Sequence, residues 1–402
     1  MVQKLVIIGG GYAGFWSALS AVRQSRALNR VDELEITLIN YDNYFTMRPR
    51  LYEVSLEGLR VELDKYSKPL GIKQIIGKAD FIDPETQQVT VSTDKGLVEL
   101  NYDYLILASG SSLKASSFPG MEYTYNIDTY NNARFMEGHL IDLARRNFSK
   151  PGDATFVVVG AGLTGLEAAT SIAVKAKALE DVYSTQKSSF RVILIEKDSQ
   201  VGRFYDEGAR DYLLNTLKDQ NIEMITDDEV SYVEQSVLAL KSGKRIETGT
   251  VVWTVGMAAS PLTAFFKGER DSLNRIKVNN YLKLPDYTNI IIAGDVSNVT
   301  VNLGKTAVMS CQFSQWQGRW AGHNAVNDLF GKDLLEYNQI GYNTCLDLGP
   351  ETALITDGWD RVLHKTGKDA KATKSWICTD LIYPSSDVEE AVTESFPKIP
   401  AF

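Results

Sequence analysis

The chain begins with an apolar stretch that passes directly into glycines and then into a helical pattern. Residues 4–8 are almost all apolar, as in a strand that is buried on both faces. Gly9, Gly11 and Gly14 follow at GxGxxG spacing, and a segment of helical periodicity comes after them. This order of strand, glycine turn and helix predicts a βαβ unit that holds a dinucleotide pyrophosphate.

A second copy of the same pattern lies about 150 residues further on. The apolar strand 155–159 leads into Gly160, Gly162 and Gly165, and the next apolar strand ends in Glu196. A carboxylate at the end of that strand accepts hydrogen bonds from the ribose hydroxyls of NAD. One such motif can be a tight turn without a ligand, but two of them favour two bound dinucleotides.

The first dinucleotide-binding fold is not complete where the second one begins. Residues 81–94 alternate in polarity around a Pro-Glu turn, which predicts a hairpin, and the strand followed by Gly294 and Asp295 comes only after the second unit. The sequence therefore predicts an α/β protein with two Rossmann-like folds, the NAD domain inserted in the FAD domain, and a small C-terminal α+β unit. The expected boundaries are 1–115 and 285–334 for the first domain, 116–284 for the inserted one, and 335–402 for the C-terminal unit.

Composition narrows the partners of these folds. The 402 residues carry a net charge of −9, which argues against nucleic acid and against a basic, membrane-binding surface. No apolar run approaches the roughly 20 residues that span a bilayer, and the acidic C-terminal tail with its prolines is a poor anchor. We expect a cytoplasmic protein with a small-molecule partner and no stable membrane insertion, and the sequence leaves a homodimer open. The basic segment 356–374 is interrupted by glycine and predicts a solvated loop.

The cysteines and histidines do not form a recognisable metal-binding motif. Cys311, Cys345 and Cys378 lie more than thirty residues apart with no CxxC pair, and the three histidines are scattered. The sequence therefore predicts no metal site and no redox-active disulfide, and it favours buried or incidental thiols.

Several motifs together resemble a known family. The segments VIIGGGYAG, YDYLILASG, VVVGAGLTGLEAA, TVVWTVG and NIIIAGD, in this order, are similar to those of the FAD-dependent pyridine nucleotide-disulfide oxidoreductases. Within that group, NYFTMRPRLYEVS and the missing CxxC resemble the type II NADH:quinone oxidoreductases. The resemblance covers roughly residues 1–335 and implies FAD on the first fold and a nicotinamide cofactor on the second.

The resemblance also implies roles for particular residues. FAD contacts are expected at Gly9, Gly11, Gly14, Asn40, Arg48, Ala79, Ala108, Gly110, Gly256, Gly294, Asp295 and Gln312. NADH contacts are expected at Gly160, Gly162, Gly165 and Glu196, and catalytic roles near the flavin at Glu167, Gln312, Gln315 and Trp316. NADH is expected over NADPH because Glu196 repels a ribose phosphate, although Lys197 or Arg203 can turn toward one.

Two positions depart from the family pattern. Asn40 stands where an acidic residue is usual, so we expect weakened FAD binding unless Asp42 compensates; a simple turn residue is the alternative. In the segment that contacts quinone in the family, Phe313 and Trp316 can place two rings across the acceptor path, with Gln315 and Gln317 free to bind a polar acceptor. The alternative for Trp316 is core packing together with Trp320.

The expected function is a flavoenzyme that transfers hydride from NADH to FAD and then two electrons to a small organic acceptor, quinone-like or a specific metabolite. Two alternatives stay open. One is an NAD(P)H oxidase or a flavin-dependent tailoring enzyme that uses oxygen. The other is a redox-sensing interaction protein that binds FAD and NADH without turnover.

Overall fold

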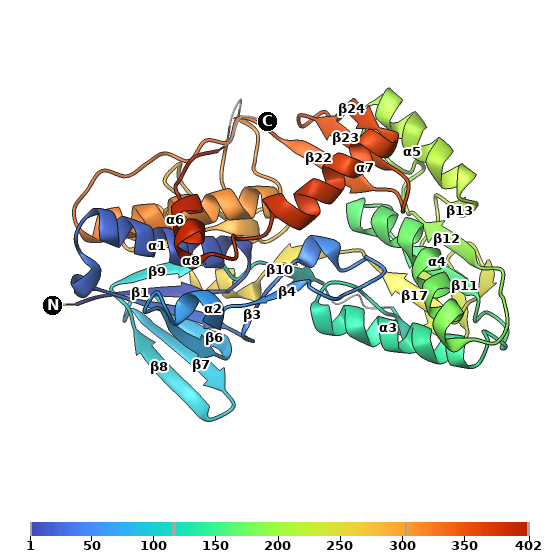
Figure 1. Ribbon diagram of the computed structural model, residues 1–402, viewed down its shortest axis with the longest axis horizontal. Coiled ribbons are helices and arrows are strands. Elements are labelled where there is room, and N and C mark those ends of the chain that lie inside the picture. The colour runs from blue at the N-terminus through green and yellow to red at the C-terminus, as the bar shows by residue number, and fades with distance from the viewer. Residues whose placement is uncertain (1, 115–117, 302–303, 400–402) are drawn as a thin grey trace.

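The computed structural model describes residues 2–114, 118–301 and 304–399, and it consists of two lobes, each built on a parallel sheet (Figure 1). The first sheet has the order β20-β9-β1-β2-β5. Its strands are β1 (Gln3–Ile8), β2 (Leu34–Asn40), β5 (Lys73–Ile76), β9 (Tyr104–Leu107) and β20 (Ile290–Ile292). Since β20 pairs with β9 from far along the chain, the first fold is completed only after the second has been made.

The second sheet has the order β13-β12-β11-β17. Its strands are β11 (Thr155–Val159), β12 (Arg191–Ile195), β13 (Ile222–Ile225) and β17 (Thr250–Trp253), and its helices are α3 (Tyr130–Arg145), α4 (Leu163–Tyr183) and α5 (Glu207–Asp219). A small antiparallel sheet of β14 (Val230–Glu234), β15 (Val237–Leu240) and β16 (Arg245–Glu247) accompanies it. The prediction of two Rossmann-like folds, one inserted in the other, is confirmed.

Shorter elements complete the first lobe and its connections. The predicted hairpin is present as β6 (Lys78–Asp83) and β7 (Gln88–Thr93), extended by β8 (Gly96–Asn101). The others are β3 (Tyr44–Thr46), β4 (Arg60–Glu62), α2 (Asp64–Ser67), β10 (Ser111–Leu113), β18 (Met257–Ala259), β19 (Ile276–Lys277) and β21 (Ser297–Asn298). Strands β10 and β18 pair with each other, so the two connections between the lobes lie together.

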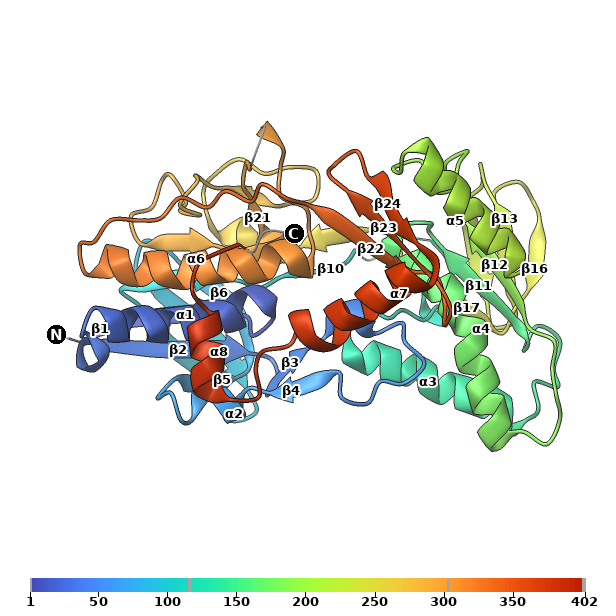
Figure 2. The ribbon, with the colours of Figure 1, turned by 45° about the horizontal axis from the view of Figure 1, so that its top comes forward.

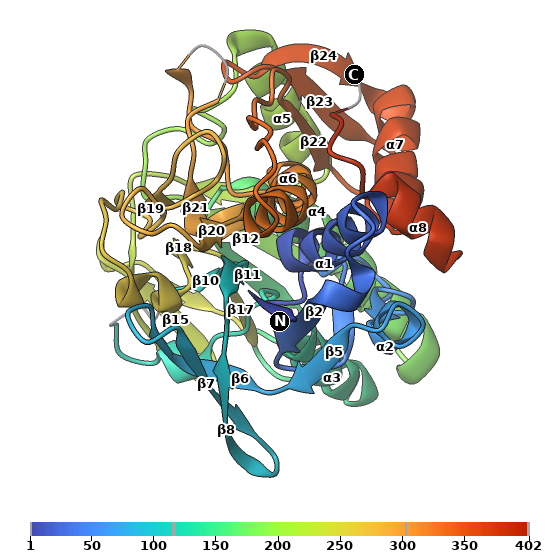
Figure 3. The ribbon, with the colours of Figure 1, turned by 90° about the vertical axis from the view of Figure 1, so that its left-hand side faces the viewer.

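Helices α1 (Tyr12–Ala27) and α6 (Cys311–Leu329) run side by side on the first sheet (Figures 1 and 3). Gly318 permits this close approach, since a Cβ there would lie 2.3 Å from the carbonyl oxygen of Ala13. The contact brings the N-terminus of α6 to the carboxyl edge of the sheet, where Gly9 and Asp295 also lie. Ligands of open α/β sheets bind at that edge.

The C-terminal part packs between the two lobes (Figure 2). It contains β22 (Asn343–Asp347), β23 (Ala353–Asp357), β24 (Val362–Thr366), α7 (Gly367–Trp376), a π-helical turn at Ile377–Leu381 and α8 (Val388–Glu394). The expected solvated loop at 356–374 is wrong, because β24 pairs with β23 and α7 buries Ala370 and Lys374. The predicted junction at 115–116 lies outside the described residues, and the domain boundaries stay predictions. No helix in the described ranges combines the length and apolarity needed to cross a bilayer.

Candidate functional site

A cavity of about 1360 Å³ lies where the first sheet, the inserted fold and the C-terminal unit meet. A pocket for one drug-sized ligand measures roughly 300–1,000 Å³, so this one has room for more than one such molecule. Its wall includes residues 9–11, 108–113, 309–312 and 342–345, together with Glu167 of α4 and Lys374 of α7. Three separate parts of the chain therefore enclose one space.

The glycine loop after β1 forms one end of this cavity. Gly9 adopts φ +106°, and a Cβ on Gly14 would lie 1.7 Å from the Gly9 carbonyl oxygen, so strand and helix meet only with glycine at both places. Gly11 has open space where its Cβ would stand. That opening at the N-terminus of α1 suits a phosphate group.

Asn40 ties this loop to the chain after β2. Its Oδ1 accepts a hydrogen bond from the N–H of Gly10 at 2.9 Å, and its Nδ2 donates to the backbone and side-chain oxygens of Asp42 at 3.0 and 3.2 Å. Asp42 in turn pairs with Arg60. Asn40 also lines the cavity, so a negative charge lies one contact away from the place where the family usually has one.

Asp295 joins three segments at the centre of the cavity. Its carboxylate accepts hydrogen bonds from the hydroxyls of Ser111 at 2.6 Å and Ser314 at 3.2 Å, and Arg48 lies 3.8 Å away. Arg48 also pairs with Asp128, which precedes α3. The predicted residues Arg48 and Asp295 thus lie together, and Asp128 joins them although no motif in the sequence marks it.

The N-terminus of α6 points two amides into the cavity. Ser310 caps the helix by accepting from the N–H of Phe313. Gln312 and Gln315 line the cavity, and their Oε1 atoms are buried with no hydrogen-bond partner among the described residues. Buried oxygens of this kind normally have a donor, so a ligand N–H group fits both.

The aromatic residues of α6 take a different place. Among the described residues, neither Phe313 nor Trp316 lines the cavity. Phe313 packs on Tyr342 and Trp359, and the ring of Trp316 lies 4.0 Å from the Arg319 guanidinium. This geometry favours core packing over a barrier on the acceptor path.

Glu167 lies in a buried pair with Lys374. Its Oε1 accepts from the Lys374 ammonium at 2.9 Å and from the N–H of Asp347 at 3.1 Å. Burial raises the pKa of Glu167 and outweighs the opposing attraction of Lys374. Burial lowers the pKa of Lys374, but the Glu167 carboxylate more than offsets this and leaves that pKa raised. No motif in the sequence marks Lys374, which lies inside the segment 356–374 that predicted a loop.

The three cysteines share this cavity despite their distance along the chain. Cys311 begins α6, Cys345 lies on β22 and Cys378 in the π-helical turn, and all three line the wall. Burial raises the pKa of Cys311 to about 12 and of Cys345 to about 11, and it also raises the pKa of Cys378. They are therefore protonated thiols at neutral pH, and none is a ready thiolate nucleophile.

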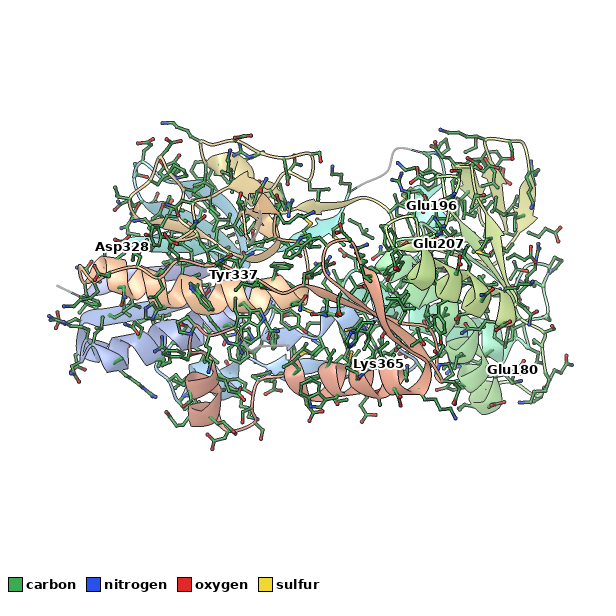
Figure 4. The ribbon with its side chains drawn as sticks, turned by 90° about the horizontal axis from the view of Figure 1, so that it is seen from above. Glu180, Glu196, Glu207, Asp328, Tyr337 and Lys365 are labelled. Carbon is green, nitrogen blue, oxygen red and sulfur yellow. The ribbon has the colours of Figure 1, made fainter. Side chains whose placement is uncertain are left out.

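The second glycine loop has the same local geometry. Gly160 adopts φ +99°, and a Cβ on Gly165 would lie 1.8 Å from the Gly160 carbonyl oxygen, while Gly162 faces open space. Glu196 accepts hydrogen bonds from the N–H groups of Ala161 at 2.8 Å and Asp198 at 3.1 Å. Figure 4 shows Glu196 in the lobe of the second sheet, away from Tyr337 beside α6.

Some of the remaining predicted residues line the cavity, and others make contacts beside it. Ala79, Ala108 and Gly110 line the cavity. The carbonyl of Gly256 accepts from the N–H of Lys114, and the N–H of Gly294 donates to Gln317 at 2.6 Å. Gly256 and Gly294 therefore connect neighbouring segments of the chain next to the cavity wall.

The chain belongs to the pyridine nucleotide-disulphide oxidoreductase family, whose sequence profile matches residues 3–318. It is a flavin-dependent oxidoreductase of a family that uses FAD and a pyridine nucleotide. Within the family it is NADH dehydrogenase-like: it is 36% identical over 391 residues, 95% of each chain, to an NADH dehydrogenase-like protein of Mycobacterium tuberculosis.

More distant relatives are consistent with this family assignment. A type II NADH:quinone oxidoreductase of Staphylococcus haemolyticus is 25% identical over 397 residues, again 95% of each chain. The structure of NDH2 from Plasmodium falciparum in complex with NADH has a TM-score of 0.77 at 14% identity and covers 98% of each chain. That structural likeness supports the fold.

Proposed function

We propose that the protein oxidises NADH and reduces a quinone-like acceptor, with FAD in the large cavity. The observation that carries this proposal is the continuity of that cavity, which runs from the Gly9 loop past Asp295 to Gln312 and on to an apolar end. When bound, FAD supplies the redox chemistry, taking hydride from NADH and passing two electrons to the acceptor.

The residues of the first fold fit that cofactor. The open space at Gly11 and the N-terminus of α1 would receive the pyrophosphate. Asp295 is fixed by Ser111 and Ser314, so it can bind a polyol chain without moving. The unpartnered oxygens of Gln312 and Gln315 can each accept a hydrogen bond from a ring N–H group.

The second fold suits NADH. Glu196 is held by the N–H groups of Ala161 and Asp198 at the end of β12, where its charge disfavours the additional phosphate of NADPH. Arg203 forms an ion pair with Asp198 at 2.9 Å. Its charge is therefore partly neutralised, which reduces the attraction it would offer to a phosphate.

The far end of the cavity suits a flat apolar acceptor. Its wall there contains the apolar side chains Ile340, Tyr342, Trp359, Trp376, Ile377, Leu381 and Ile382. Glu167 and Lys374 are the polar groups beside it, with Lys374 able to donate to an acceptor oxygen. An apolar wall with few polar groups is the usual setting for binding a small ring.

A half-reaction experiment tests the proposal. The purified, flavin-loaded protein is mixed without oxygen with NADH or NADPH, and the flavin absorbance is followed; a quinone of short or long tail, or oxygen, is then added. We expect reduction by NADH and reoxidation by both quinones, because the ring of Trp316 does not line the path.

Other outcomes would direct the function elsewhere. Reoxidation by oxygen as fast as by quinone would favour an oxidase. Flavin reduction without reoxidation by any acceptor would favour a redox sensor. Failure of NADH to reduce the flavin at all would overturn the proposal.

A further inference from the structure

The large cavity opens to solvent in the C-terminal unit, and its mouth there combines apolar and charged side chains. Ile340 and Trp376 line the cavity with exposed fractions of 69% and 52%. Asp357, His364 and Lys365, from the hairpin of β23 and β24, line it as well. A ligand that matches this mouth therefore has a flat apolar part and a charged or polar group.

The register of the C-terminal sheet places Lys365 on the cavity face. Ile355 of β23 is the partner of Cys345 on β22 and of Lys365 on β24. Paired residues of neighbouring strands point to the same face of a sheet, and all three of these residues line the cavity. Figure 4 shows Lys365 beside α7, between the two lobes.

The Lys365 ammonium has donors to spare. It donates to the hydroxyl oxygen of Thr373 at 3.3 Å, and that hydroxyl donates to the carbonyl oxygen of Asp369 at 3.0 Å. An ammonium carries three N–H donors, so two of them are left for another acceptor. Since Thr373 also lines the cavity, its contact holds the ammonium at the wall.

The other cations of the cavity wall each have a carboxylate partner. The pairs are Arg48 with Asp128, Lys78 with Asp80, His364 with Asp357, and Lys374 with Glu167. Lys365 forms no such pair within the described part of the chain, where its one side-chain contact is the Thr373 hydroxyl. The charge of Lys365 is therefore available to a ligand.

Asp357 does not cancel this charge. It lies two residues beyond Ile355 on β23, or roughly 6–7 Å along the strand from the partner of Lys365. Its carboxylate pairs with His364 at 2.8 Å and accepts a hydrogen bond from the side-chain amide of Asn343 at 2.5 Å. The mouth thus keeps an uncompensated positive charge beside apolar side chains.

We propose that the electron acceptor carries an anionic substituent, such as a carboxylate, on its flat ring, and that Lys365 binds this substituent at the cavity mouth. This inference rests on the proposed function and names the substrate class of the same site. The ring packs on the apolar wall that includes Ile340 and Trp376. The substituent takes no part in the electron transfer, so Lys365 determines specificity and is not a catalytic residue.

A pair of quinones tests the proposal. Naphthoquinone and naphthoquinone sulfonate reoxidise the NADH-reduced flavin, and the ratio of their kcat/KM values is compared between wild type and Lys365→Met, so that the intrinsic reactivity of each quinone cancels. We expect the ratio of sulfonate to parent to fall by about tenfold or more in Lys365→Met, mainly through the KM of the sulfonate. Lys365→Arg should recover most of the ratio, and added salt should lower it in wild type.

Lys368→Met is the matched control for this ratio. Lys368 lies on α7 with a side chain that is 87% exposed, so its removal changes the net charge by the same amount away from the cavity wall. The ratio should stay at the wild-type value. An equal fall in both variants would mean that overall charge, and not a contact at Lys365, attracts the sulfonate, and it would overturn the proposal.

A binding measurement without turnover accompanies the kinetics. Calorimetry of the flavin-loaded protein compares naphthoate with naphthamide, which has nearly the same shape and no charge. We expect naphthoate to bind more tightly to wild type by about tenfold, and we expect this difference to vanish in Lys365→Met. The comparison needs no electron transfer, so it reports on the lysine alone.

The possible failures can be told apart. Equal affinities for naphthoate and naphthamide, with the same quinone ratio in wild type and Lys365→Met, would overturn the anionic acceptor. Slower flavin reduction by NADH in Lys365→Met, at an unchanged quinone ratio, would assign the lysine to the nucleotide and also overturn it. Wild-type flavin that NADH does not reduce would overturn the proposed function, and the two affinities would still decide the role of Lys365.

Discussion

The two glycine loops are nearly identical in their local structure and very different in their surroundings. Gly9 and Gly160 have φ values of +106° and +99°, and the Cβ distances at Gly14 and Gly165 are 1.7 and 1.8 Å. The first loop forms the end of a cavity that three parts of the chain enclose. Of the second fold, residues such as Leu163, Thr164 and Glu167 reach that cavity, and the Gly160 loop itself does not line it.

The residue at the end of the neighbouring strand differs as well. Asn40 and Glu196 both accept a backbone N–H of their glycine loop, at 2.9 and 2.8 Å. An amide does this without charge and a carboxylate does it with charge. Holding the glycine loop in place therefore requires only a hydrogen-bond acceptor. The negative charge of Glu196 is not needed for that contact, so it can contribute to the choice of nucleotide.

The largest expected effect concerns the enclosed site. Lys374→Met leaves the Glu167 carboxylate buried without its ion partner, which should reduce the free energy of unfolding by about 3–5 kcal/mol at neutral pH. Burial already raises the pKa of Glu167, and loss of Lys374 raises it further. A raised carboxyl pKa favours the folded state below that pKa and loses this stability as pH rises through it, so the deficit should shrink at acidic pH.

Urea unfolding at acidic and neutral pH measures this deficit. Lys368→Met on the same helix is the control, because its side chain is 87% exposed and its ion pair with Glu351 spans 4.0 Å. The double variant Glu167→Gln, Lys374→Met should recover most of the loss. A deficit independent of pH would mean that lost packing, and not the charge, explains it.

The next effect separates the two loops. Gly14→Ala places a methyl group against Gly9, and Gly165→Ala does so against Gly160, which costs about 1–3 kcal/mol or more in each fold. The first should release FAD, and the second should retain FAD while weakening reduction by NADH. Flavin absorbance after gel filtration and the NADH concentration dependence of reduction measure the two effects.

Gly138→Ala is the matched control for both loops. This helical glycine of α3 has open space at its Cβ position, and alanine there should raise stability by up to about 1 kcal/mol. Loss of FAD from Gly165→Ala, with retention by Gly14→Ala, would reverse the assignment of cofactors to the two folds.

The charge of Glu196 gives the third effect. Glu196→Gln keeps an acceptor for the Ala161 N–H and removes the charge, so the preference for NADH over NADPH should narrow by about tenfold to a hundredfold, or roughly 1–3 kcal/mol. The ratio of kcat/KM for the two nucleotides measures it, with Glu207→Gln as an exposed control on α5. An unchanged ratio would place the ribose away from Glu196.

The smallest effect tests the matching position of the first fold. The sequence predicts that Asp at position 40 improves FAD retention, whereas the contacts of Asn40 with Asp42 favour the opposite effect. Asn40→Asp replaces a donor to Asp42 with a second carboxylate, so FAD should dissociate faster by several-fold, on the order of 1 kcal/mol. Adding Asp42→Asn should restore retention, and the FAD dissociation rates of the four proteins in this cycle measure the coupling. Slower dissociation from Asn40→Asp alone would support the ordinary family arrangement.

The sequence by itself determined the features that depend on neighbouring residues. Both glycine loops, the hairpin after β6 and the place of Glu196 follow from steric limits and alternating polarity within short segments. The insertion of one fold in the other was also visible, because the strand before Gly294 and Asp295 had no partner in its own neighbourhood. These constraints act over a few residues, so a linear pattern records them.

Tertiary structure alone decided what surrounds the first loop. Lys374 meets Glu167 across 207 positions of the chain, and Cys311, Cys345 and Cys378 come to one wall from three elements. Trp316, which suggested a barrier, lies against Arg319 in the packing between helices. A buried charge is stable only with its partner, and that partner was set by how α7 packs on the inserted fold. No local pattern in residues 356–374 carries that information.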